Sequence, residues 1–334
     1  MRKLTRIAII LSIISVIALS GFIYYGGLDL APSEHIDYRQ EMRNFVQNIS
    51  AYAKEFNPDF IVIPQNGHEL LTKNGEADGP LAIDYINAID GIGREELFYG
   101  YYNDNEPTPE NIRNMMIPFM DLAENNGVEV LVIDYCWTHS YVDDSYEQSA
   151  RRGYISFAAD NRSLSDIPPY PEEPYNVNYQ NITALSDAKN FLYLINPESF
   201  PTKEDFLEAL RETNYDILII DLFYNREQLT FEEVNSLKAK ANSGRRLVIA
   251  YMSIGEAESY RYYWNPDWET NPPPWLAEEN PDWPGNYKVR YWYKEWQDII
   301  YGNNSSYLKR IIDAGFDGVY LDLIDAYEYF ENQA

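Results

Sequence analysis

The chain has 334 residues, with 26 Lys and Arg against 53 Asp and Glu, and its formal net charge is -27 at pH 7. This acidic excess argues against nucleic acid and anionic membrane surfaces as partners. The only cysteine is Cys136, so no intramolecular disulfide can form and the core must hold the fold together. The length has room for two average domains or for one α/β barrel of about 250 residues.

The N-terminal segment has the pattern of an export signal. Basic residues precede an apolar stretch that runs from Ile7 to about Tyr25. Because this stretch is close to the roughly 20 residues that span a bilayer, a cleaved signal peptide and an uncleaved signal anchor both fit. We therefore expect a signal peptide or anchor at 1–25, with a membrane tether through 7–25, a linker at 26–36, and an extracellular or cell-surface location.

Beyond the linker, apolar segments with strand character alternate with segments of helical spacing, which predicts a parallel sheet. Helices are expected over 37–56, within 81–87, over 112–126, after 201, after 230 and over 306–314. A proline-rich connector is expected over 161–190, and its first part, 161–179, can hold neither helix nor strand. Eight strands are predicted, and they begin at Phe60, Ala88, Val128, Phe191, Asp216, Leu247, Val289 and Val319.

Acidic side chains stand at or just after the ends of several of these apolar runs. In an α/β barrel the carboxyl ends of the strands surround the active site, so these acids should converge on one pocket. The pattern predicts a (β/α)8 TIM barrel over 37–334. The acids concerned are Glu69, Asp134, Asp221, Glu256, Asp322 and Asp325.

Three C-terminal segments and three N-terminal ones carry a family resemblance. They are YMSIGEAESYRYYW (251–264), PDWPGNYKVRYW (281–292), GFDGVYLDLIDAYEYF (315–330), FIVIPQNGHELL (60–71), IDGIGREELFYG (89–100) and VLVIDY (130–135). The chain resembles extracellular barrel proteins related to family 114 of glycoside hydrolases, which is associated with endo-α-1,4-polygalactosaminidase activity. The resemblance implies a (β/α)8 barrel.

The order of these segments is reversed relative to that family, in which the C-terminal group comes first. The chain therefore resembles a circular permutant, with the connector joining the former ends. A permuted barrel keeps its neighbour contacts, so Tyr329 should lie beside the region of Asp37. Two unrelated half-domains are the alternative.

Glycoside hydrolysis uses two carboxyl groups that flank the scissile bond. The resemblance implies Asp322 as nucleophile or stabilising anion and Glu69 as acid/base. Each has a structural alternative, an ion pair or cap for Asp322 and a helix-dipole role for Glu69. Glu256 is the rival acid unless a partner such as Arg261 keeps it ionised, in which case it binds substrate.

The remaining candidates would bind sugar. Planar amides both donate and accept hydrogen bonds, and aromatic rings stack on sugars and attract cations. Glu95 and Glu96 could extend the acidic rim, with Arg94 as their partner. The predicted substrate-binding residues are Glu256, Asp325, Asp134, Asp221, Gln65, Asn66, Tyr251, Arg261 and Trp292.

The sequence contains no glycine-rich phosphate loop, no paired-cysteine zinc spacing and no HExxH segment, so we expect no cofactor and no metal ion. Crowded carboxylates favour a cationic partner. The family resemblance, together with this charge, implies an exported hydrolase that cleaves internal bonds of an α-1,4-linked galactosamine-type polysaccharide. A non-catalytic glycan-binding barrel protein and a hydrolase of a different α-glycan are the alternatives.

Overall fold

The computed structural model describes residues 36–333, and the chain from Tyr38 onward forms one compact unit. The predicted signal segment, its membrane tether and all but the last residue of the linker lie outside the described residues. Within 36–333, no helix is both long enough and apolar enough to cross a bilayer.

Two parallel sheets form the centre of the fold. The first has five strands in the order β1 (Ile61–Pro64), β13 (Gly318–Asp322), β9 (Leu247–Ser253), β6 (Ile217–Asp221) and β5 (Phe191–Leu194). The second has the order β2 (Gly91–Glu95), β3 (Glu129–Tyr135) and β4 (Ile155–Ala159). These strands are almost entirely buried, and those of the first sheet and β3 consist mainly of apolar residues, as expected for parallel strands covered on both faces.

The two sheets meet at both of their edges. Beyond the end of β1, Gln65 forms a parallel bridge with Gly93 of β2, and the Asn66 amide donates to the Gly93 carbonyl at 2.8 Å. At the other edge β4 contacts β5, where the rings of Phe157 and Phe191 lie 5.7 Å apart. Each of the eight parallel strands therefore lies beside two others.

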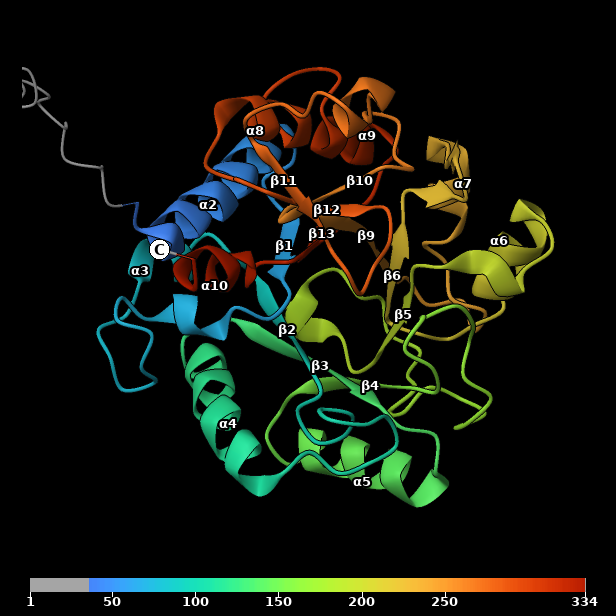
Figure 1. Ribbon diagram of the computed structural model, residues 1–334. Coiled ribbons are helices and arrows are strands. Elements are labelled where there is room, and N and C mark those ends of the chain that lie inside the picture. The colour runs from blue at the N-terminus through green and yellow to red at the C-terminus, as the bar shows by residue number, and fades with distance from the viewer. Residues whose placement is uncertain (1–35, 334) are drawn as a thin grey trace, which may run out of the picture. The chain divides into compact units, whose positions relative to one another are not determined.

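The helices lie on the outer side of these strands (Figure 1). Two predicted helix ends are confirmed: Thr230 and Glu233 form a reciprocal capping box, and Gly315 follows α9 with φ +83°. The α-helices are α2 (Tyr38–Phe56), α3 (Ile83–Ile86), α4 (Glu110–Asn125), α5 (His139–Ala150), α6 (Lys203–Arg211), α7 (Phe231–Ser236), α8 (Lys294–Ile300), α9 (Tyr307–Asp313) and α10 (Ala326–Glu331). The 3-10 helices are η1 (His68–Leu71), η2 (Leu185–Asp187), η3 (Pro197–Ser199) and η4 (Pro266–Glu269).

Tyrosine rings fill part of the space between the strands. The rings of Tyr193 on β5 and Tyr320 on β13 are both buried and lie 5.1 Å apart. A Cβ atom at Gly93 of β2 would lie 1.9 Å from the Tyr320 hydroxyl oxygen. Gly93 therefore gives the Tyr320 side chain its room. Cys136, just after β3, is also buried, with 1% of its surface exposed.

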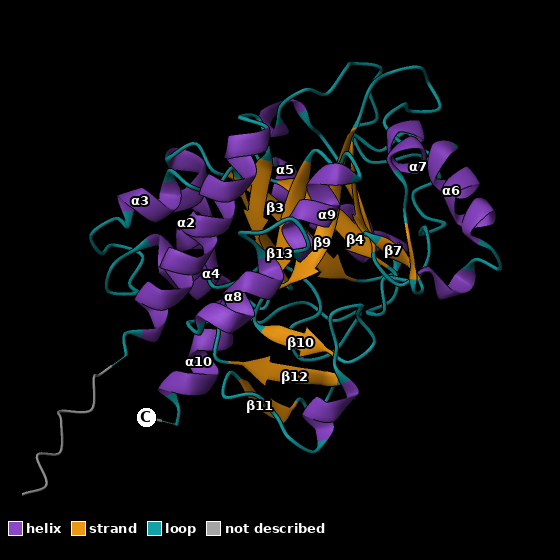
Figure 2. Cartoon of the chain, turned by 90° about the horizontal axis from the view of Figure 1, so that it is seen from above, coloured by secondary structure: helices purple, strands orange, loops and turns teal. Residues whose placement is uncertain are grey.

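A separate antiparallel sheet lies apart from the parallel strands (Figure 2). Its order is β10 (Glu256–Glu258), β12 (Asn286–Val289) and β11 (Leu276–Glu279). Val289 ends a strand of this sheet, so the predicted parallel strand that begins at Val289 is wrong. A two-stranded hairpin of β7 (Phe223–Tyr224) and β8 (Glu227–Gln228) completes the strands.

The eighth parallel strand, β4, was not predicted. Its sequence ISFAA contains Ser156, Ala158 and Ala159, whose small side chains give a weak apolar signal. The strand predicted from Ala88 begins three residues later, at Gly91. Residues 161–179 contain neither helix nor strand, as predicted.

The first and last helices of the described chain lie side by side. The rings of Tyr38 in α2 and Phe330 in α10 are 5.7 Å apart, and Arg39 pairs with Glu331 at 2.9 Å. The predicted proximity of the segments around residues 37 and 329 is therefore confirmed.

Candidate active site

A cavity of about 650 Å³ opens at the carboxyl ends of the parallel strands. Strand ends supply much of its lining, because side chains there leave the packed interior. The residues that end a parallel strand or follow it within two positions and line the cavity are Gln65, Asn66, Glu95, Tyr135, Ile195, Asn196, Asp221, Phe223, Asp322 and Leu323. The structure thus brings together acids that are far apart in the sequence.

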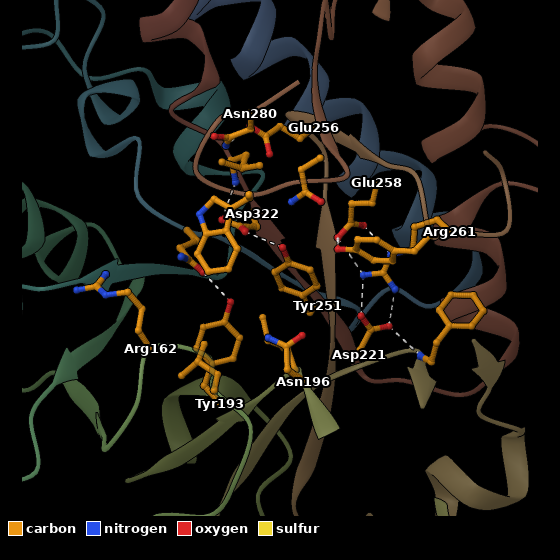
Figure 3. Close-up of a pocket in the computed structure, with 18 of the residues that line it drawn as sticks. Arg162, Tyr193, Asn196, Asp221, Tyr251, Glu256, Glu258, Arg261, Asn280 and Asp322 are labelled. Atoms are coloured by element: carbon orange, nitrogen blue, oxygen red, sulfur yellow. Dashed lines mark hydrogen bonds and ion pairs between the residues drawn. The ribbon is translucent and has the colours of Figure 1, made fainter. Parts of the chain in front are cut away.

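Asp322, the last residue of β13, lies in the middle of the cavity. Its Oδ2 accepts a 2.7 Å hydrogen bond from the Tyr251 hydroxyl (Figure 3), and its Oδ1 accepts one of 2.7 Å from the Leu323 amide. Burial, followed by the negative charge of Glu95, raises the pKa of Asp322 to about 7, although both hydrogen bonds act in the opposite direction. The carboxyl can therefore exchange a proton near neutral pH.

Glu95, at the end of β2, is held by neutral donors. Its Oε2 accepts from the Asn66 side-chain amide at 3.0 Å, and its Oε1 accepts a short hydrogen bond from the Tyr135 hydroxyl. The Arg162 guanidinium lies 4.1 Å from the centre of the Tyr135 ring. Asn66 and Tyr135 thus hold the Glu95 carboxylate in place at the cavity.

The predicted sugar ligands Gln65 and Asn66 both line the cavity, but each already has a protein partner. The Gln65 Oε1 accepts from the Tyr193 hydroxyl at 2.9 Å. The Asn66 Oδ1 accepts from the Glu95 amide at 3.3 Å. In this structure the two amides therefore position cavity side chains.

Arg261 pairs with two carboxylates at the cavity wall (Figure 3). Its guanidinium donates to both oxygens of Asp221, at 2.9 and 2.7 Å, and to Glu258 Oε2 at 2.6 Å. Burial raises the pKa of Asp221, and the charge of Arg261 opposes that rise. Two acids share one cation here, so the group keeps a negative charge when all three are ionised.

Arg261 does not bind Glu256, the partner considered from the sequence. Glu256 Oε1 instead accepts from the Asn280 side-chain amide at 2.8 Å and from Lys288 at 3.3 Å. Glu256 does line the cavity, as does Asp325. Burial and the charge of Glu328 raise the pKa of Asp325 to about 7.

Glu69, predicted as a catalytic residue, is not among the residues that line the cavity. It lies in η1, where its Oε2 accepts a 2.9 Å hydrogen bond from the Tyr327 hydroxyl. Asn66 and Gly67 have consecutive left-handed backbones, with φ +61° and +55°, which turn the chain sharply after β1. In this structure Glu69 therefore bonds Tyr327 and does not line the cavity with Asp322.

Asp134 and Trp292 are also not among the lining residues. The Asp134 carboxylate is fully buried and accepts from the amides of Phe98 and Tyr99 and from the Ser145 hydroxyl, so it is a structural bond acceptor. Trp292 packs on the rings of Tyr38 and Phe330, at 5.1 and 4.8 Å. The sequence expectation for both residues is corrected here.

Several lining residues were missed or underrated. Successive side chains of a strand point to opposite faces, so an outward Asp134 in β3 implies a Tyr135 that points the other way. Alternation alone does not tell from the sequence which of the two side chains faces the cavity. Glu96 reaches the site only through its 2.6 Å pair with Arg162, another lining residue. The other lining residues absent from the predictions include Glu258, Asn280, Tyr193 and Asn196.

Within residues 36–333, no group of three or more His, Cys, Asp or Glu side chains is arranged to hold a metal ion.

Arg94, predicted to pair with the rim acids, instead lies 3.4 Å from His68 Nδ1. Burial, with the charge of Arg94, lowers the pKa of His68 to about 4, so this histidine is neutral at pH 7.

Comparison with known proteins relates part of the chain to other sequences. An uncharacterized protein, MJ1477, of Methanocaldococcus jannaschii is 40% identical over 183 residues, which are 53% of this chain and 49% of the relative. An uncharacterized protein of Thermotoga maritima is 42% identical over 124 residues, 37% of each chain. One of Deinococcus radiodurans is 42% identical over 127 residues, 38% of this chain and 39% of the relative.

The chain thus spans about half, or less, of the length of these curated relatives. Residues 180–334 match glycoside-hydrolase family GH114. This range contains Asp221, Tyr251, Glu258, Arg261 and Asp322, which line the cavity. The match supports the family resemblance over the C-terminal part of the chain.

Proposed function

We propose that the protein is a glycoside hydrolase that cleaves internal bonds of an α-1,4-linked galactosamine-type polysaccharide. The observation that carries this proposal is Asp322, a cavity carboxyl whose pKa is raised to about 7 by burial and by Glu95. The family match over 180–334 supports the reaction class. The N-terminal sequence supports action at or outside the cell surface, with residues 7–25 as a signal peptide or tether.

We also propose that the eight parallel strands close into a (β/α)8 barrel that is circularly permuted relative to its family. Support comes from the β1–β13 pairing, the bridge between Gln65 and Gly93, and the contact of β4 with β5. The adjacency of α2 and α10 fits new termini placed in one surface connection.

In the mechanism we propose, Asp322 is the proton donor and Glu95 is the opposing anion. The Asp322 carboxyl gives its proton to the glycosidic oxygen as the bond from the anomeric carbon to that oxygen breaks. Glu95, held by Asn66 and Tyr135, then either attacks the anomeric carbon to form a glycosyl ester that water hydrolyses, or takes a proton from the water that attacks that carbon. This assignment replaces Glu69, which the structure does not place at the cavity.

The charge of the lining supports a cationic substrate. Its acidic side chains outnumber its three arginines, Arg162, Arg226 and Arg261. Crowded carboxylates raise one another's pKa, and an ammonium group relieves that repulsion. A deacetylated galactosamine unit carries such a group. The acidic lining residues are Glu95, Glu198, Asp221, Glu256, Glu258, Asp322 and Asp325.

A reducing-end assay on partly deacetylated α-1,4-polygalactosamine tests the proposal. Wild type should release new ends, whereas Asp322→Asn and Glu95→Gln should lose at least about 100-fold in rate. Glu69→Gln is the matched control and should keep most of the rate, because its carboxyl bonds Tyr327 outside the cavity.

Three outcomes would change the conclusion. Full activity of Asp322→Asn would show that Asp322 is not the proton donor and would contradict the proposed mechanism. A folded Glu69→Gln as inactive as Asp322→Asn would return Glu69 to the catalytic pair. Wild type that binds the polymer but releases no ends would favour the glycan-binding alternative.

A further inference from the structure

We infer that Trp283 is a stacking platform for one sugar ring of the cationic glycan, at the mouth of the cavity. This inference rests on the proposed function and adds a specific binding residue to it. Trp283 lies in the turn between β11 and β12 of the small antiparallel sheet, and it lines the cavity.

The indole of Trp283 is available to a ligand. It is 53% exposed and makes no ring contact within the described chain, whereas five other tryptophans pack against aromatic rings. Tyr260, which also lines the cavity and is partly exposed, is occupied, because its hydroxyl bonds Glu258 and Arg261 lies 5.2 Å from its ring centre. Of these two exposed aromatic residues of the cavity lining, Trp283 is therefore the one whose ring face is free to bind a ligand.

The turn that carries Trp283 is fixed in place before any ligand arrives. The Asn280 Oδ1 accepts from the Asp282 amide at 3.1 Å, while its side-chain amide donates to Glu256 at 2.8 Å. The Asn286 amide donates to the Trp283 carbonyl at 3.1 Å, and the Gly285 amide donates to Glu279 at 2.7 Å. Because the backbone is already ordered, a sugar that stacks there loses little free energy in ordering the protein.

The chemistry around the ring selects an amino sugar. An indole face attracts a cation that lies within about 6 Å of the ring centre. Glu256 lines the cavity beside Asn280, a residue of the Trp283 turn, as Figure 3 shows, and Glu258 lines the cavity from the same strand, β10. A ring that carries an ammonium group thus gains from the indole face and from the nearby carboxylates, whereas a neutral sugar gains only from stacking.

The test measures binding rather than turnover, on an Asp322→Asn parent that does not consume its ligand. Trp283→Ala, Trp283→Phe and the control Trp137→Ala are added singly to that parent. Trp137 is similarly exposed, at 50%, also makes no ring contact, and does not line the cavity. Affinity for partly deacetylated α-1,4-galactosamine oligosaccharides is measured by calorimetry near pH 6, beside fully N-acetylated oligosaccharides.

Trp283→Ala should weaken binding of the deacetylated probe about tenfold, with a smaller loss for the N-acetylated probe. Trp283→Phe should lose less, and Trp137→Ala should bind like the parent. Equal affinities for Trp283→Ala and Trp137→Ala would overturn the inference, as would a parent that binds neither probe. If wild type does not hydrolyse the polymer but Trp283→Ala still weakens binding, the hydrolase proposal is overturned and the Trp283 inference stands.

Discussion

The Arg261 guanidinium donates hydrogen bonds to both carboxylate oxygens of Asp221, at 2.9 and 2.7 Å, and to Glu258 at 2.6 Å. Loss of the guanidinium leaves two buried carboxylates without a cation. We expect Arg261→Met to lower the free energy of unfolding by about 3–5 kcal/mol. Urea titration at pH 7 measures it, with Arg151→Ala, in the exposed pair with Glu147, as a control that should change by less than about 1 kcal/mol. Equal effects of the two changes would contradict the burial argument.

The pH profile should identify the proton donor. If Asp322 donates, kcat/KM falls as pH rises through about 7, where the carboxyl loses its proton. The Tyr251 hydrogen bond lowers this pKa, so Tyr251→Phe should raise it and move the alkaline limb to higher pH by about one pH unit. Tyr193→Phe removes a hydroxyl that bonds Gln65 and should leave the limb in place. A limb that does not move in Tyr251→Phe would exclude Asp322 as the donor.

The Asp325 carboxyl should lower the free energy of unfolding at high pH, where it is ionised. Its pKa is about 7 in the folded protein, above its ordinary value of 3.8, so the folded state binds the extra proton and stability falls as pH rises from about 4 to 7. Asp325→Asn should therefore raise the free energy of unfolding at pH 8, on the order of 2–4 kcal/mol, and leave it unchanged at pH 4.

Asp187 provides a control of opposite sign. The amides of Thr183 and Ala184 lower the pKa of Asp187, so its contribution to stability is present at high pH and is lost in acid. Asp187→Asn should therefore lower stability at pH 8, and this loss should shrink as pH falls below 3.8. Urea unfolding of both variants measures the two trends, and trends of the same sign would contradict the electrostatic account.

The contact between α10 and α2 should be important for stability. Phe330 is buried between the rings of Tyr38 and Trp292, at 5.7 and 4.8 Å. Phe330→Ala should lower the free energy of unfolding by about 3–5 kcal/mol because it opens a cavity in this cluster. Phe56→Ala is the control, since Phe56 is 48% exposed. A Phe330→Ala variant as stable as wild type would show that α10 adds little to the fold.

Acids at strand ends correctly predicted cavity-lining residues when the acid is itself the last residue of its strand. Asp221 and Asp322 are the last residues of β6 and β13, and both line the cavity. The rule failed for Glu69, because the left-handed backbone at Asn66 and Gly67 turns the chain aside. Sequence position alone cannot show such a turn.

The other errors have local physical causes. The length and apolar character of residues 289–292 suggested a parallel strand, but Val289 pairs in an antiparallel sheet, so Trp292 packs outside the cavity. The small side chains of β4 hid a true strand. The Asp134 carboxylate is bound by Phe98 and Tyr99, partners 36 and 35 residues away in the sequence, which no pattern near residue 134 reveals.

Because Cys136 is buried, the reactivity of its thiol can report local opening of the structure around it. The thiol is 1% exposed, burial raises its pKa, and its backbone amide bonds the Ala159 carbonyl at 2.9 Å. Because the sequence has no second thiol, a thiol-reactive dye can label the chain at one position only. Its labelling rate therefore reports how often the β3–β4 edge separates, without any substitution.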